Sequence, residues 1–429
     1  MRRQLSFDLN PPAAAVLPFF FSAPLFALLA GLLLLWLGPA AMASRWSPAT
    51  LGLAHLFTLG VLSMSMIGAL IQLLPAVAGC PVPHAATLGR SVHALLCCGT
   101  VLLVAGFVFS LRWAMQLAPA LLLGAFGWLL AGASCALWRQ QAAGTAPMVG
   151  AIRLALAALL VTIGLGAALA SAFAWPGLTR LPLPLLTDLH AGWGLLGWTG
   201  LLVAGVAFQV LPMFQVTPLY AAAIERWLAT CLFLALVLWS VSIIAEVGQA
   251  LAAAALAAGF ALFAGVTWRL LARRKPAADA MTLSWRLAMA SLVAACLLAS
   301  APAALGGQAR GMALGVLFVF GFAGSVILGM LYKIVPFLLW YHLQGEPGVT
   351  RASMPSVKQL VPERGARQQV GAHALALALL VCAAWWPELL ARPAALAVCV
   401  ASAWLARNLF GALRIARRAV PRSARPCAA

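Results

Sequence analysis

The stretch that organises this chain is Gly68-Ala69-Leu70-Ile71-Gln72-Leu73-Leu74-Pro75, which returns twice further along. The second copy is Gly205-Val206-Ala207-Phe208-Gln209-Val210-Leu211-Pro212, and the third is Gly329-Met330-Leu331-Tyr332-Lys333-Ile334-Val335-Pro336. Another glycine precedes each copy by eight residues, at Gly60, Gly197 and Gly321. The copies begin 137 and 124 residues apart. Self-similarity at such a period indicates that a unit of about 130 residues occurs three times.

The composition is that of an integral membrane protein. Of 429 residues, 64% are hydrophobic and only 8% are charged, and the mean hydropathy is +1.02. Because backbone polar groups in lipid must be satisfied within the segment, we expect the spans to be helices. About twelve spans are predicted, near 15–37, 49–77, 89–111, 115–138, 149–174, 188–214, 221–245, 248–272, 283–303, 309–340, 369–387 and 391–413.

The span count and the motif agree with each other. The three copies end the second, sixth and tenth spans, so the twelve helices divide into three blocks of four. We therefore expect one all-α membrane domain with pseudo-threefold repetition, built from residues 1–140, 141–278 and 279–429. Residues 343–368, which hold several prolines and mixed charges, are expected to form a cytoplasmic loop.

The net charge of +19 does not indicate nucleic-acid binding, because the cations gather in loops and at the C-terminal tail. The clusters lie after the eighth span, after the tenth span and at the end of the chain. The positive-inside tendency then places both termini in the cytoplasm of a bacterial inner membrane, with lipid as the surrounding partner. The nine cysteines are spread along the chain without a CxxC motif, so neither disulfides nor zinc sites are expected.

Two histidines occupy similar places in two of the three motif helices. His55 lies five residues before Gly60, and His190 lies seven residues before Gly197, both on the side away from the cytoplasm. A pair of histidines on neighbouring helices is how a membrane haem b is held, because imidazole suits iron. Copper is the alternative metal, with Met64 and Met66 as soft partners.

The two histidines are not strict equivalents in sequence. Offsets of five and seven residues differ by roughly 200° around a regular α-helix. They would be strict equivalents only if the sixth span were distorted near its start, where Gly192 and Gly194 lie. The alternative is that each histidine simply bonds a backbone carbonyl.

The remaining polar residues of the spans have plainer interpretations. We expect His93 and His373 at cytoplasmic helix ends, and we expect no ligand role for His84 or His342. Lys333 is expected to extend toward the membrane surface. An alternative function, that of a cofactor-free carrier or channel, would use a polar path at the motif positions Gln72, Gln209 and Lys333.

The sixth span resembles a helix of a known family. Leu196-Gly197-Trp198-Thr199-Gly200, followed by Gly205 and Leu211-Pro212, is similar to the tenth helix of subunit I in C-class haem–copper oxidases. By this resemblance His190 takes the place of the high-spin haem ligand, and Gly192 replaces the low-spin ligand. In the second span, His55 falls at the position that corresponds to the low-spin haem ligand. The family, with its nitric oxide reductases, has twelve helices in three four-helix arcs, and NnrS-type membrane proteins resemble this chain in overall organisation.

The departures from that family concern the reactive centre. The seventh span, from Tyr220 to Arg226 onward, lacks the copper-binding histidines, and the tenth span lacks both haem histidines. The resemblance therefore implies a divergent member that is no working oxygen or nitric oxide reductase. The expected role is haem b binding in respiratory electron transfer, nitric oxide response or assembly of haem and copper centres, with oxidase or reductase subunits as partners. A scaffold that retains only the fold is a further alternative.

Overall fold

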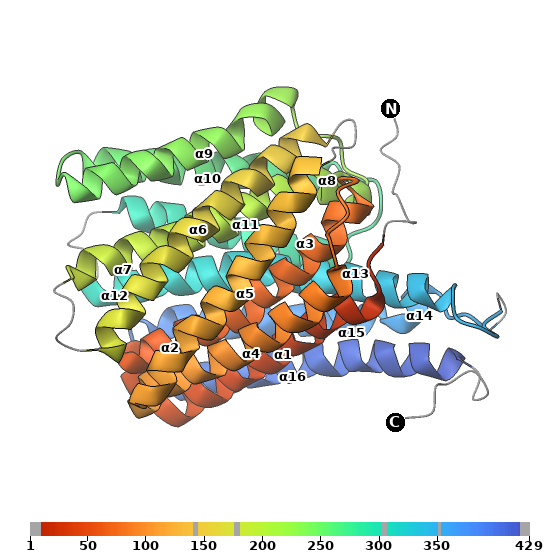
Figure 1. Cartoon of the computed structure of the whole chain (residues 1–429), viewed down its shortest axis with the longest axis horizontal. Helices are drawn as coiled ribbons and strands as arrows, with labels where there is room; N and C mark the ends of the chain where they lie inside the picture. Colours follow the sequence, from red (N-terminus) through yellow and green to blue (C-terminus); the bar gives the residue numbers. More distant parts are fainter. Residues whose placement is uncertain (1–9, 140–144, 176–180, 302–306, 351–352, 421–429) are drawn as a thin grey trace.

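The fold is a bundle of long helices (Figure 1). The computed structural model describes residues 10–139, 145–175, 181–301, 307–350 and 353–420, and in these ranges it contains helices but no strand. The helical elements are α1 (Ala13–Leu37), η2 (Gly38–Met42), α2 (Pro48–Phe57), η3 (Thr58–Ser63), α3 (Met64–Ala76), α4 (Ala85–Phe109), α5 (Arg112–Arg139), α6 (Ala146–Ala174), α7 (Leu183–Gly192), η4 (Trp193–Gly200), α8 (Leu201–Gln215), α9 (Ala222–Ile244), α10 (Gln249–Ala272), α11 (Ala280–Ser300), α12 (Gly307–Val316), η5 (Leu317–Gly324), α13 (Ser325–Leu343), α14 (Val357–Leu360), α15 (Glu363–Ala383) and α16 (Pro387–Ala419).

Twelve helices among the described residues are long and apolar enough to cross a membrane, which confirms the predicted multi-pass architecture. Each motif helix is one continuous span that consists of an α-helix, a short middle segment and a second α-helix. The three spans are Pro48–Ala76, Leu183–Gln215 and Gly307–Leu343. In their most apolar windows, 83%, 78% and 72% of residues are buried, against 28–50% for the other nine spans. The motif helices therefore form the interior of the bundle, and the other spans surround them.

A π-helical segment interrupts each motif helix. The three segments η3, η4 and η5 end at Ser63, Gly200 and Gly324, which in each case is five residues before the first glycine of the motif. A π-helix bonds i to i+5, so it widens the helix and often marks a functional region. The segments also meet one another, since η5 contacts both others and Trp198 Nε1 donates to Ser63 Oγ at 3.4 Å.

The repeated glycines allow each motif helix to pack closely against one neighbour. A Cβ at Gly60, Gly197 or Gly321 would lie 2.5–2.8 Å from a side chain of α1, α6 or α11. The motif glycines Gly68, Gly205 and Gly329 meet the same three helices seven residues, or two turns, away. The contacted residue pairs are Phe26 and Phe19, Ala158 and Ala151, and Ser291 and Ser284.

The outer helices close a ring around this interior. α5 packs on α6, α10 packs on α11, and α16 packs on α1, which lies beside it in Figure 1. Each contact joins the last span of one predicted four-helix block to the first span of the next. The chain is therefore one body in which the N-terminal and C-terminal helices are neighbours.

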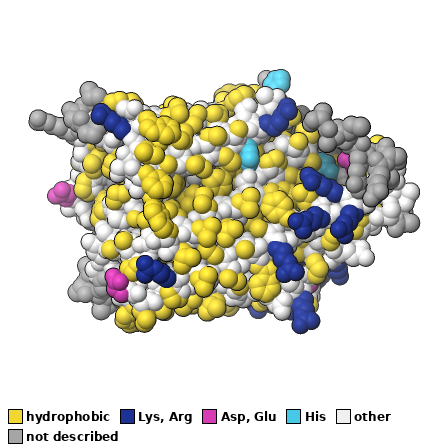
Figure 2. All heavy atoms as spheres, turned by 90° about the horizontal axis from the view of Figure 1, so that it is seen from below, with side chains coloured by type: hydrophobic (Ala, Val, Ile, Leu, Met, Phe, Trp, Pro, Cys, Tyr) yellow, Lys and Arg dark blue, Asp and Glu magenta, His cyan; other side chains and the backbone are white. Residues whose placement is uncertain are grey.

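The two ends of the bundle differ in charge. α1 begins and α16 ends at the same end, on the right of Figure 1. Figure 2 shows hydrophobic side chains over the middle of one face, with Lys and Arg gathered mainly toward that same end. This is the distribution that a membrane-spanning bundle with one cationic surface requires.

Helix boundaries differ from the prediction at two places that matter for the histidines. α15 begins at Glu363 rather than near residue 369, and α4 begins at Ala85 rather than near residue 89. The expectation that His373 and His93 lie at helix ends is therefore wrong, because both lie inside their helices. The predicted loop 343–368 is correspondingly shorter and contains α14.

Candidate metal centre

His55 lies in the last turn of α2, just before η3. Ser47 caps the N-terminus of this helix, because its side chain accepts a hydrogen bond from the Thr50 amide, and Pro48 takes the first helical position. Nδ1 of His55 lies 2.8 Å from the carbonyl oxygen of Leu51, one turn earlier in the same helix. A carbonyl only accepts, so Nδ1 carries the proton and the lone pair of the neutral ring lies on Nε2.

His190 lies in the last turn of α7, just before η4. Its Nδ1 lies 3.0 Å from the carbonyl oxygen of Thr162, which belongs to the neighbouring helix α6. The same argument places the proton on Nδ1 and the lone pair on Nε2. The alternative interpretation, a hydrogen bond to a backbone carbonyl, therefore holds for both histidines. It uses only Nδ1, so Nε2 of each ring is still available as a metal ligand.

The structure brings His55 and His190 together. Their ring centres are 6.1 Å apart and their planes differ by 21°. Two metal–nitrogen bonds of about 2.0 Å, plus about 1.1 Å from each nitrogen to its ring centre, separate such rings by about 6 Å across one ion. Among the described residues neither Nε2 has a hydrogen-bond partner. The observed ring-centre separation equals this value.

The two motif helices differ where the histidine offsets of five and seven residues differ. η3 and η4 end at equivalent positions, but η4 starts two residues earlier relative to the motif, at Trp193. The wider π geometry therefore covers most of the residues between His190 and Gly197. A distortion of the sixth span near Gly192 and Gly194 is thus present.

The surroundings of the pair are apolar. Phe107 of α4 stacks on His55 with ring centres 5.5 Å apart, and Phe173 of α6 meets Phe107 edge-on at 5.7 Å. Phe107 also belongs to a small hydrophobic cluster with Leu103 that is separate from the main core. An apolar wall of this kind suits the hydrophobic edge of a porphyrin.

The histidine pair offers two imidazole donors. Met64 and Met66 follow His55 by nine and eleven residues, on the order of 14 and 16 Å along the helix, so they cannot share its metal. Two imidazoles alone suit an iron whose remaining four ligands come from a porphyrin.

His373 and His93 use Nε2 in hydrogen bonds to serines. His373 lies within α15, where its Nε2 meets Ser325 Oγ at 3.0 Å and its ring stacks on Phe320 at 4.3 Å. His93 lies within α4, where its Nε2 meets Ser22 Oγ at 2.8 Å. These contacts give both histidines a structural role between helices. His84 precedes α4 and His342 lies in the last turn of α13, away from the pair.

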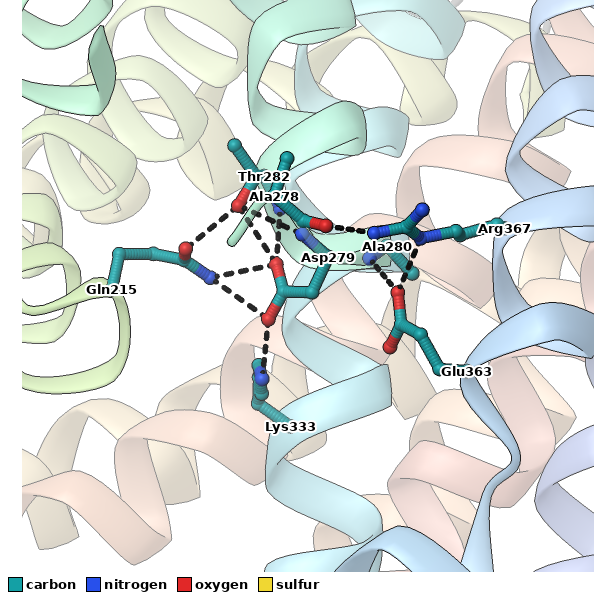
Figure 3. Close-up of polar contacts among 8 residues, drawn as sticks. All are labelled: Gln215, Ala278, Asp279, Ala280, Thr282, Lys333, Glu363 and Arg367. Atoms are coloured by element: carbon teal, nitrogen blue, oxygen red, sulfur yellow. Dashed lines mark hydrogen bonds and ion pairs between the residues drawn. The ribbon is translucent and has the colours of Figure 1, made fainter. Parts of the chain in front are cut away.

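Lys333 does not extend freely to the surface as expected, because it pairs with Asp279 (Figure 3). Its Nζ lies 2.6 Å from Asp279 Oδ2, and Gln215 Nε2 donates to Asp279 Oδ1 at 3.0 Å. Thr282 completes the cluster through its amide and hydroxyl. Beside it, Arg367 donates to the Ala278 carbonyl, so the cluster ties α8, α11, α13 and α15 together.

Asp279 is ionised in this setting. Burial by itself raises the pKa of Asp279, but the Lys333 ammonium and the bonds from Thr282 together lower the pKa below its ordinary value. The carboxylate also caps the N-terminus of α11 in a capping box with Thr282. Sequence reasoning missed this partner of Lys333, although Asp279 followed three residues later by Thr282 is a helix-start pattern.

The other two motif positions carry amides. Gln72 Nε2 donates to Asn10 Oδ1 at 2.8 Å, just before α1 begins. Gln209 is buried at the equivalent place in α8. A polar path along the three motif positions stays a prediction.

No protein-family model matches this sequence. A search of curated proteins finds no match either. The motif helices and the histidine pair that they carry are therefore the features of this chain that bear on its function.

Proposed function

We propose that this protein is a membrane haem b protein in which His55 and His190 are the two axial ligands. The observation that carries the proposal is their 6.1 Å ring separation, with both Nδ1 atoms bonded to carbonyls. Hydrogen bonding at Nδ1 fixes the ring orientation and makes Nε2 a better ligand. The haem would supply a one-electron Fe(II)/Fe(III) couple at this place.

The protein's own part would be to hold and shield the cofactor. The Leu51 and Thr162 carbonyls would orient the rings, and Phe107 would cover one side of His55. With both axial positions filled by protein, electron transfer is the activity best suited to the site. A role in nitric oxide response or in assembly of respiratory haem and copper centres would require that one of the two ligands be displaced.

The architecture supports membership in the haem–copper oxidase-like superfamily as a divergent branch. We infer three four-helix blocks, residues 1–140, 141–278 and 279–429, related by a pseudo-threefold axis through the π segments. Support comes from the recurring glycine contacts and from the ring of last-to-first helix pairs. The histidines that bind copper and haem in the oxidase's reactive centre are missing from the seventh and tenth spans of this chain. We therefore do not propose oxygen or nitric oxide reduction.

We place the protein in a bacterial inner membrane with both termini in the cytoplasm. The gathering of Lys and Arg at the end where α1 begins and α16 ends supports this orientation. The histidine pair then lies toward the opposite surface. Electron donors or acceptors among oxidase or reductase subunits would reach it from that side.

The test is an absorption spectrum and a pyridine haemochrome assay on detergent-purified protein. We expect a stoichiometric b-type Soret band, reduced or shifted in His55→Ala and in His190→Ala. His93→Ala is the matched control, since His93 is also a membrane histidine but is bonded to Ser22. Colourless protein from cells with ample haem would contradict the proposal, and metal or solute-transport assays would then follow.

A further inference from the structure

The two histidines of the pair are held in different ways. His55 bonds a carbonyl of its own helix, α2, so its ring orientation is set locally. His190 bonds Thr162 of α6, so its orientation depends on a contact between two helices. The carbonyl of Thr162 must therefore be open to a side chain from outside α6.

A carbonyl inside an α-helix is normally shielded. It accepts the N–H of the residue four positions later, and the Cβ of that later residue tilts back toward it. For Thr162 this later residue is Gly166, which has no Cβ. The Thr162 oxygen is consequently reachable by the His190 ring as well as by the helix's own amide.

The ring of His190 fills the space that a side chain at position 166 would take. A Cβ built on Gly166 would lie 2.9 Å from His190 Cε1, 3.4 Å from Nδ1 and 3.9 Å from Nε2. All three of its nearest neighbours belong to that one ring. Gly164, two residues earlier in α6, would meet nothing within 4 Å.

We propose that Gly166 is the positioning residue that fixes the Nδ1–H tautomer of His190 and so presents its Nε2 to a metal. The metal itself rests on the proposed function, whereas the tautomer does not. A methyl group at position 166 would push the ring from α6 and break the bond to Thr162. His55 would be unaffected, because its bond lies within α2.

The first test uses the protein without cofactor. ¹⁵N NMR of histidine-labelled protein reports which ring nitrogen carries the proton, and His190→Gln identifies the His190 signals. We expect a single Nδ1–H tautomer in the wild type and in Gly164→Ala, and mixed tautomers in Gly166→Ala. The His373 signals report on folding in each sample. Unchanged His190 signals in a folded Gly166→Ala protein would overturn the proposal.

The second test uses the haem-loaded protein and carbon monoxide. We expect the reduced wild type and Gly164→Ala to show little Soret change with carbon monoxide, since both axial positions are filled. Gly166→Ala should keep its haem through His55 and bind carbon monoxide at the freed position. Gly166→Ala that excludes carbon monoxide as the wild type does would contradict the inference. A colourless wild type would instead remove the proposed haem function, and the NMR result would still decide the role of Gly166.

Discussion

At the scale of single residues, hydrogen bonds to one side of a ring decide what its other side can do. His55 and His190 each donate Nδ1–H to a carbonyl and keep Nε2 free, whereas His373 and His93 meet a serine through Nε2. Sequence position does not separate these two kinds of histidine, because all four lie within spans. Their hydrogen-bond partners do: a carbonyl of the same helix for His55, and groups on neighbouring helices for the other three.

The ion pair of Lys333 and Asp279 should stabilise the end of the bundle at which α8 ends and α11 begins. We expect Lys333→Ala to lower the free energy of unfolding by about 1–2 kcal/mol, between the values for exposed pairs and for buried charged hydrogen bonds. Thermal unfolding in detergent measures this. Lys358→Ala, whose side chain lies on the exposed helix α14, is the control and should have little effect.

The same pair makes stability depend on pH. The pKa of Asp279 is lowered in the folded protein relative to an ordinary value of about 3.9, so the stabilisation is fully present above that value. It is lost as the pH falls through the lowered pKa. The difference in unfolding temperature between wild type and Asp279→Asn should therefore shrink as the pH is reduced from 6 toward about 3. A difference that stays constant over this range would contradict the assignment.

At the scale of elements, the π segments and the glycines beside them set how the motif helices face their neighbours. Each segment ends five residues before a motif glycine, and each motif helix is held against the first helix of its predicted block. Widening the helix before this contact turns the preceding residues to a new direction. His55 and His190 lie in those preceding residues.

Gly205→Ala should disturb this packing. The added Cβ would collide with Ala151 Cβ, which cannot turn away, so α6 and α8 must separate. We expect a loss of about 1–3 kcal/mol, typical of overpacking. Gly265→Ala in α10 is the matched control, because a Cβ there meets nothing within 4 Å and alanine favours the helix. Equal unfolding temperatures for the two variants would show that close contact at Gly205 is unimportant.

At the scale of the whole molecule, the distribution of charge sets the orientation in the membrane. Glu246 lies in the exposed turn between α9 and α10, and Glu346 lies in the exposed turn after α13, at the opposite end of the bundle. Both are accessible in the structure, so either would report on the side of the membrane it occupies.

We expect Glu246→Cys to react with a membrane-impermeant maleimide on intact cells, since it should face away from the cytoplasm. Glu346→Cys should react only after the inner membrane is opened. The wild-type protein measures the background labelling of the native cysteines, several of which lie in spans. The reverse labelling pattern would place both termini outside and the histidine pair toward the cytoplasm.

The sequence by itself determined the membrane-spanning helices and their number, and its repeated glycines singled out the three motif helices. Lipid enforces helices wherever apolar runs are long, and repeated glycines indicate close packing, so both signals are local. It also selected His55 and His190 from six histidines. Only the tertiary structure decided that these two rings meet, that Gly166 opens the Thr162 carbonyl and that Asp279 pairs with Lys333. Those outcomes depend on which face each helix turns inward, and one added residue in a helical turn rotates that face by about 100°.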